Sequence, residues 1–178
     1  LLHVSTDFVF DGNKKAPYTE EDVPNPTGVY GQTKLDGEKA IQETFENYFI
    51  IRTSWVYSQF GNNFMKTMIR LASERDSLSV VNDQIGTPTN AVDLAEVLVT
   101  LITEHSNLNT EHYGVFNFSN EGQCSWFDFA KEIFELNNIS INVQPIPTTS
   151  YPTPAKRPAY SVLDKSKIKN TFGIEIDN

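Results

Sequence analysis

A tyrosine and a lysine stand four residues apart in the segment VYGQTKLDGEKAI, which begins at Val29. Residues i and i+4 of a helix lie on one face, so Tyr30 and Lys34 can point into the same cleft. A free tyrosine is a poor acid or base at neutral pH, but a neighbouring ammonium group favours the phenolate form. If Thr6, at the end of an earlier strand, shares a hydrogen bond with a substrate oxygen, the trio suits proton transfer at a carbonyl while hydride moves at its carbon.

The same spacing has a second interpretation. A half-packed tyrosine followed four residues later by a solvated lysine is also an ordinary helix face without a chemical role. The rest of the chain has to decide between proton transfer and packing.

The chain alternates between apolar β-rich runs and helical patterns. The predicted strands lie in LLHVSTDFVF (1–10), YFIIRTSWVY (48–57), LSVV (78–81) and GVFNFSN (114–120). Predicted caps at Thr27, Asn90 and Ser125 begin three helices, and a fourth amphipathic helix covers Phe64 to Ala72. This alternation predicts an α/β fold with a largely parallel sheet.

Polar residues cluster where the predicted strands end. They are STD at 5–7, RTSW at 52–55 and NFSN at 117–120. In open parallel sheets, ligands bind at the carboxyl ends of the strands, so these segments are the candidate site.

Composition excludes some classes of partner. A net charge of −9 and a pI near 4.7 argue against nucleic acid and against an anionic membrane as partners. Cys124 is the sole cysteine, so the chain has no internal disulfide, which suits a reducing cytoplasm. His3, His105 and His112 lack ligand spacing, so no metal site is predicted, and no apolar run is long enough to span a bilayer.

Several motifs together resemble the extended short-chain dehydrogenase/reductase family. VSTDFVFDG is followed by a proline-containing loop, YGQTK, a helix and IIRTSWVY; then come NDQIGTPTNAVDLAEV, GVFNFSNEGQCSWFDFAKEI and RPAYSVLD, in the expected order. The resemblance covers nearly the whole chain and implies the C-terminal half of a Rossmann-like parallel sheet with a small interleaved substrate-binding lobe. Residues of about 1–60 and 91–118 would belong to the sheet, and about 61–90 and 119–178 mostly to the lobe.

The resemblance is closest to family members that reduce a dTDP-linked keto sugar. It implies reduction of the C4 ketone of dTDP-4-dehydro-6-deoxy-L-mannose to dTDP-L-rhamnose, with NADPH or NADH as the hydride donor. By this resemblance Tyr30 gives a proton to the ketone oxygen, Lys34 tunes Tyr30 and binds the nicotinamide ribose, and Thr6 orients the substrate oxygen.

The resemblance also implies substrate contacts. Asp7 and Trp55 fall where such reductases contact the sugar, and Asn63 and Gln84 lie in segments that border the sugar-nucleotide site. Each has a structural alternative, since Trp55 at a strand end suits a partial core, and Asn63 and Gln84 suit loop or cap positions.

One part of the family pattern is missing. No GxGxxG or GxxGxxG turn, which binds the dinucleotide pyrophosphate, occurs in the sequence. The residue that would choose between NAD and NADP is missing too. By resemblance Leu1 corresponds to the start of about the fourth strand of the nucleotide-binding sheet. We therefore expect the chain alone to be inactive, and its apolar first strand to pair with another chain, with a homodimer as one candidate.

Two other functions stay open. A non-catalytic relative would keep the fold as a regulatory or binding subunit, although a scaffold has no need for Thr6, Tyr30 and Lys34 together. An epimerase or dehydratase acting on another nucleotide sugar is the other alternative. Dehydratases generally need an Asp–Glu pair after the threonine, whereas Asp7 is followed here by Phe8, which favours simple reduction.

Overall fold

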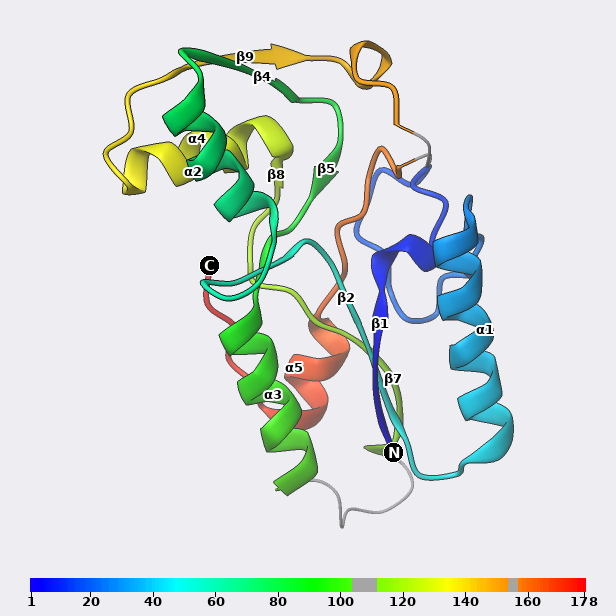
Figure 1. The fold of residues 1–178 in the computed structure, drawn as a ribbon. Coiled ribbons are helices and arrows are strands. Elements are labelled where there is room, and N and C mark those ends of the chain that lie inside the picture. Colours follow the sequence, from blue (N-terminus) through cyan, green and yellow to red (C-terminus); the bar gives the residue numbers. More distant parts are fainter. Residues whose placement is uncertain (104–111, 154–156) are drawn as a thin grey trace.

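The computed structural model describes residues 1–103, 112–153 and 157–178. Its central feature is a parallel sheet in the order β1-β2-β7, made of β1 (Leu2–Thr6), β2 (Phe49–Thr53) and β7 (Gly114–Asn117) (Figure 1). The register places Ser5 beside Arg52 and Arg52 beside Asn117, with Thr6 beside Thr53. The predicted α/β class with a parallel sheet is confirmed.

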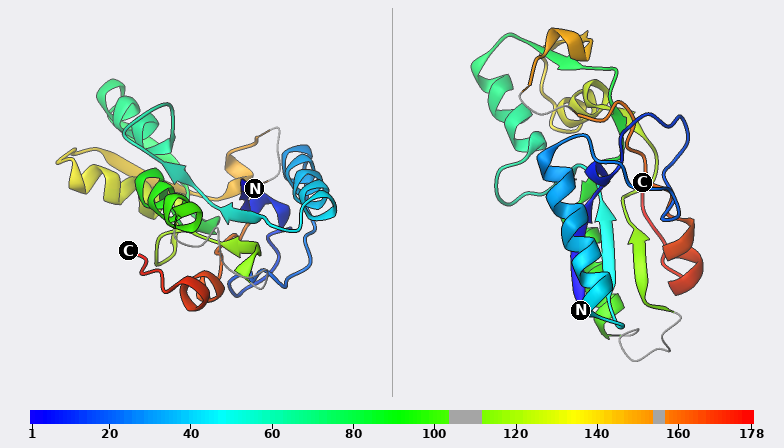
Figure 2. Two further views of the ribbon diagram at one scale, coloured as in Figure 1. Left: turned by 90° about the horizontal axis from the view of Figure 1, so that it is seen from below. Right: turned by 90° about the vertical axis from the view of Figure 1, so that its right-hand side faces the viewer.

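Helices cover both faces of this sheet. The helix α1 (Val29–Thr44) lies along one face, and α3 (Ala91–Thr103) and α5 (Ser166–Phe172) lie on the other side (Figures 1 and 2). The second face is apolar, and its buried cluster consists of Phe49, Ile51, Leu94, Val97, Leu101, Phe116, Phe118 and Ile168. Because strand side chains alternate between faces, the row Ser5, Arg52 and Asn117 lies on the face toward α1.

A lobe lies beyond the carboxyl end of the sheet (Figure 1). Its elements are α2 (Phe64–Glu74), α4 (Trp126–Leu136), the parallel pair β4 (Ser77–Val81) and β9 (Asn142–Ile146), and the antiparallel pair β5 (Ile85–Gly86) and β8 (Cys124–Ser125). The lobe has its own buried cluster, formed by Met68, Leu78, Val80, Ala130, Ile133 and Phe134. Sheet and lobe are therefore each packed around a separate apolar core.

Short elements connect these parts. They are η1 (Asp7–Val9), which follows β1 directly, the pair β3 (Val56–Tyr57) and β6 (Thr89–Asn90), and η3 (Thr148–Ser150).

The division of the chain into a sheet part (about 1–60 and 91–118) and a mostly substrate-binding lobe (about 61–90 and 119–178) stays a prediction. Within the described residues, α5 packs against the main sheet. None of the described helices combines the length and apolar character that a membrane span needs.

The helix starts follow local chemistry. Ser125 and Asp128 form the predicted capping box of α4, and Asn90 accepts a hydrogen bond from the Val92 amide at 2.9 Å. The predicted cap at Thr27 is wrong. Gly28 is the N-cap residue of α1, with an extended backbone and no side-chain hydrogen bond to the helix. The helix therefore begins at Val29, and Tyr30 lies in its first turn.

Candidate functional site

Thr6 ends β1 and caps η1, so its side chain lies at the carboxyl edge of the sheet. The Thr6 hydroxyl accepts a hydrogen bond from the Phe8 amide at 3.2 Å and donates one to Asp7 Oδ1 at 3.0 Å. Both Thr6 and Asp7 are buried. They form a hydroxyl–carboxyl pair at the point where β1 turns into η1.

Asp7 is the charged group most affected by this position. Burial raises its pKa from the ordinary value of 3.8 to about 6, while the Ser161 and Thr6 hydroxyls oppose that rise. Within the described residues, its Oδ2 atom is buried and has no partner at normal hydrogen-bond geometry. An unpartnered, buried carboxylate oxygen is costly in a fold and suits a ligand hydroxyl as its partner.

We expect Asp7→Asn to stabilise the fold near neutral pH and to do so much less near pH 4. The pKa of Asp7 in the folded protein lies above its unfolded value, so the contribution of Asp7 to stability is fully present below about pH 4 and is lost as the pH rises through about 6. Above about pH 6 the buried Asp7 carboxylate lowers the free energy of unfolding by about 3 kcal/mol at most, and the neutral amide of asparagine removes this penalty. Thermal unfolding of both forms at the two pH values measures this, and an equal shift at both would contradict it.

Tyr30 and Lys34 lie on the side of α1 that meets β1 and η1. Lys34 Nζ donates a hydrogen bond to the Val4 carbonyl of β1 at 2.8 Å. Tyr30 is 56% exposed, and its ring meets the Phe8 ring edge-on with centroids 5.6 Å apart. The ammonium group is thus tied to the strand that ends in Thr6, and the phenol stands at the same edge open to solvent.

Gly31, between these two residues, makes the close approach possible. A Cβ atom on Gly31 would lie 2.1 Å from the Phe8 carbonyl oxygen and 2.9 Å from Pro26 Cβ. Any other residue would push the first turn of α1 away from η1. Gly31 therefore sets how near Tyr30 comes to Thr6.

Trp55 lies in a strained position between the sheet and the lobe. Its φ angle of 46° is in the left-handed region, which is a genuine outlier for a bulky residue. Its indole stacks on Trp126 of α4 with centroids 3.5 Å apart and planes 12° apart. On Gly86, a Cβ would lie 2.5 Å from Trp55 Cε2, so only glycine leaves room for the indole. The lobe thus holds Trp55 in place at the strand ends.

Asn63 and Gln84 have local partners in the lobe. Asn63 caps α2 by accepting from the Lys66 amide at 3.1 Å, and its amide donates to the Ser58 carbonyl at 2.6 Å. Gln84 is buried and donates to Thr148 Oγ1 at 3.0 Å. These are structural roles, and contacts of the two residues with a substrate stay predictions.

In the part of the chain that the structure describes, the remaining reactive groups do not form a second site. Burial, with a smaller contribution from Asp128, raises the pKa of the Cys124 thiol to about 11, which disfavours the thiolate. Across residues 1–103, 112–153 and 157–178, no three His, Cys, Asp or Glu side chains are placed to hold a metal ion. His105 lies outside the described residues.

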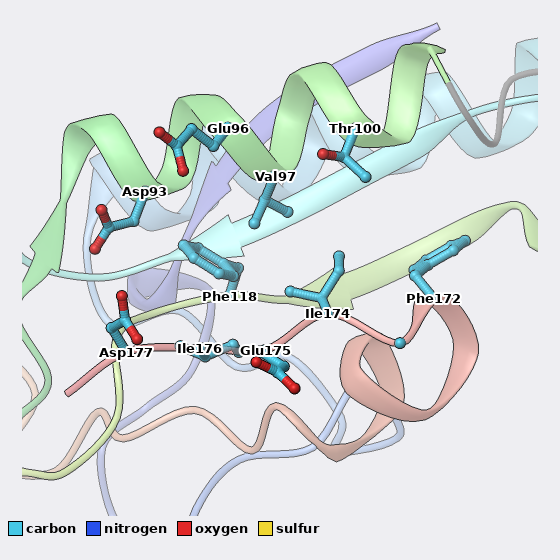
Figure 3. Close-up of a pocket in the computed structure, with 11 residues that line it drawn as sticks. Asp93, Glu96, Val97, Thr100, Phe118, Phe172, Ile174, Glu175, Ile176 and Asp177 are labelled. Carbon is cyan, nitrogen blue, oxygen red and sulfur yellow. The ribbon is translucent and has the colours of Figure 1, made fainter.

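A separate cavity of about 330 Å³ lies between α3 and the C-terminal segment (Figure 3). Its lining includes the acidic residues Asp93, Glu96, Glu175 and Asp177. None of the predicted site residues lines it. The cavity is therefore distinct from the candidate site formed by Thr6, Tyr30 and Lys34.

Sequence reasoning missed Gly31 and Gly86, and it also missed a buried ion pair between Glu38 of α1 and Arg52 of β2. The sequence does contain weak signals for Gly31 and for the ion pair of Arg52. A glycine inside a helical pattern costs about 1 kcal/mol and hints at a packing reason, and an arginine inside an apolar strand needs a buried partner. Neither signal says which residue is the partner.

Comparison with known proteins decides the family. A family model described as the RmlD substrate binding domain matches residues 1–178. The chain belongs to this family. Membership in the RmlD substrate binding domain family agrees with the predicted resemblance and with the parallel α/β sheet.

Individual relatives of this RmlD-family chain carry a consistent name. The chain is 45% identical to a dTDP-4-dehydrorhamnose reductase of Sinorhizobium fredii strain NGR234, across 100% of this chain and 62% of that protein. A Bacillus anthracis dTDP-4-dehydrorhamnose reductase solved in complex with NADP has a TM-score of 0.92 and 41% identity, covering 99% of this chain and 61% of that one. A Clostridium acetobutylicum ortholog has a TM-score of 0.91 and 47% identity, with coverage of 99% and 61%. The chain spans about three fifths of the length of these relatives.

Proposed function

We propose that the protein reduces the C4 ketone of dTDP-4-dehydro-6-deoxy-L-mannose to dTDP-L-rhamnose. Support comes from the similar dTDP-4-dehydrorhamnose reductases and from the placement of Thr6, Tyr30 and Lys34 at one edge of the sheet. The observation that carries the proposal is the solvent-open Tyr30 phenol beside the end of β1, with Lys34 bonded to the same strand.

The residues have defined parts in this reaction. Tyr30 donates its phenolic proton to the ketone oxygen, and Thr6 orients that oxygen through its hydroxyl. The Lys34 ammonium supplies a positive charge beside the same strand and binds the nicotinamide ribose. Asp7 accepts a hydrogen bond from a sugar hydroxyl at its unpartnered Oδ2, and Trp55 lies against the sugar.

The chain also offers partners for a nicotinamide cofactor. Lys34 uses one N–H on the Val4 carbonyl, which leaves further donors for a ribose hydroxyl, and Tyr30 is open to the same space. When bound, the cofactor supplies the hydride to C4. NADPH is our choice over NADH, because the similar Bacillus anthracis protein was solved with NADP.

The test is NADPH oxidation by the protein at its full natural length, with the dTDP-4-dehydro sugar as substrate. Turnover that requires this sugar supports the proposal. No turnover with the dTDP sugar would reject it. Turnover of a different nucleotide sugar would then indicate another enzyme of the superfamily, and thymidine-nucleotide binding without turnover would indicate a non-catalytic relative.

We expect residues 1–178 alone to show no NADPH turnover, because they contain no glycine-rich turn for the cofactor pyrophosphate. The full-length protein assayed beside the purified 178-residue chain is the control. Sugar-dependent NADPH oxidation by the shorter chain would overturn this expectation.

The proposal also covers the cellular location and the oligomeric state of the protein. A cytoplasmic location agrees with a single cysteine, which gives the chain no internal disulfide. A homodimer stays a prediction that light scattering of the protein can test.

A further inference from the structure

Three side chains from different elements meet in one buried polar cluster under α1. Glu38 of α1 receives the Arg52 Nη2 donor at 2.7 Å and the Arg52 Nε donor at 3.1 Å, and Ser5 of β1 donates to the same carboxylate at 2.5 Å. The Glu38 and Arg52 side chains are only 1% and 4% exposed. The guanidinium also lies over the Phe10 ring, 5.1 Å from its centroid, just beyond η1. We call Ser5, Glu38 and Arg52 the Glu38 cluster.

The cluster connects the elements that carry the proposed catalytic groups. Ser5 directly precedes Thr6 in the sequence. Glu38 follows Lys34 by four residues, as Lys34 follows Tyr30, so the three lie along one side of α1. The cluster thus joins α1 to β1 and β2. None of its three side chains is among the proposed catalytic or substrate-contacting residues, so the cluster would act through the position of α1.

Apolar packing alone does not locate α1. Its buried residues are Gly31, Leu35 and Glu38, so Leu35 is the one buried apolar side chain on the described helix. Apolar contact is non-directional, whereas a bidentate guanidinium–carboxylate pair has a fixed geometry. Leu35 packs with Val9, Phe10, Tyr18 and Leu163, and the hydrogen bonds of Lys34 and Glu38 add contacts of fixed direction to this packing of α1 against the sheet.

Stability does not explain the cluster. Desolvating two charges offsets most of their mutual attraction, and apolar replacements of similar volume are often neutral or stabilising. We propose that the Glu38 cluster is a positioning device that holds Tyr30 and Lys34 at the correct distance from Thr6. This inference rests on the proposed reductase function and deepens it.

The test separates position from stability in the full-length protein. In the variant Ser5→Ala/Glu38→Leu/Arg52→Met, no charge or hydroxyl of the cluster is left buried without a partner. We expect an unfolding midpoint equal to or above that of the wild type, a KM within about threefold, and a kcat lowered by about 10- to 100-fold. A merely structural cluster would instead give a lowered midpoint and an intact kcat, which would overturn the inference.

A matched control uses an exposed pair of the same chemistry. Arg70 and Glu74 of α2 form an ion pair with 60% and 49% exposed side chains. Arg70→Met/Glu74→Leu is expected to leave kcat and KM unchanged. If the triple variant does not fold, Glu38→Asp replaces it, since it keeps the charge and shortens the reach; an unchanged kcat in that variant contradicts the proposal.

Hydrogen exchange provides a readout that does not depend on turnover. In the triple variant, the backbone amides of the first turns of α1 should exchange faster than in the wild type, and those of α3 should exchange at the wild-type rate. Absence of wild-type turnover would reject the proposed function, while the exchange result would still decide whether the cluster positions α1. Equal exchange of α1 in both proteins would reject the positioning role.

Discussion

Tyr30→Phe is expected to lower the rate of NADPH-dependent sugar reduction by about 10²- to 10⁴-fold, the range over which a general acid contributes. The phenol of Tyr30 is the exposed hydroxyl at the edge where Thr6 and Lys34 also lie. Phenylalanine keeps the aromatic ring, and so keeps the edge-on contact with Phe8. The variant therefore removes the proton donor and leaves the packing of α1 in place.

The measurement is steady-state kinetics of the full-length protein, with the unfolding midpoint of each form. We expect kcat to fall with little change in KM, because the lost interaction belongs to the transition state. Tyr48→Phe, before β2 at the other end of the sheet, is the control and should keep the wild-type rate. A Tyr30→Phe enzyme with more than about a third of the wild-type kcat would remove Tyr30 from the mechanism.

Gly31→Ala has the second largest expected effect. The new Cβ would lie 2.1 Å from the Phe8 carbonyl oxygen, which is backbone and cannot rotate away. Either α1 or η1 has to move, at a cost in stability of about 1–3 kcal/mol. Since Tyr30 precedes Gly31 and Thr6 precedes η1, the same movement separates the proton donor from the residue that orients the substrate oxygen. A displacement of about 1 Å is enough for a loss of about 100-fold in kcat.

Gly37→Ala in the same helix is the matched control. Nothing lies within 4 Å of a Cβ built on Gly37, so alanine there meets no obstacle. It is expected to stabilise α1 by about 0.5–1 kcal/mol through its helix propensity and to leave the rate unchanged. Unfolding midpoints and kcat of both variants test the pair together. Equal stability and equal rates in both variants would show that the approach of α1 to η1 does not matter.

Local patterns in the sequence determined the class of fold. Alternating strand and helix patterns predicted the α/β sheet, and Ser125 with Asp128 predicted the start of α4, because these signals depend on residues within a few positions of one another. The spacing of Tyr30 and Lys34 also placed both on one side of α1 for the same reason. The predicted cap at Thr27 was wrong, because the helix begins at Val29 and the extended Gly28 is its N-cap residue.

Only the tertiary structure decided which distant residues meet. Gly31 touches Phe8, Arg52 of β2 pairs with Glu38 of α1, and Trp55 stacks on Trp126 across 71 positions of sequence. Nothing in the sequence near Arg52 or Trp55 names these partners. Each contact arises where the sheet, α1 and the lobe pack together, so it depends on the three-dimensional placement of elements and not on the local preferences of their residues.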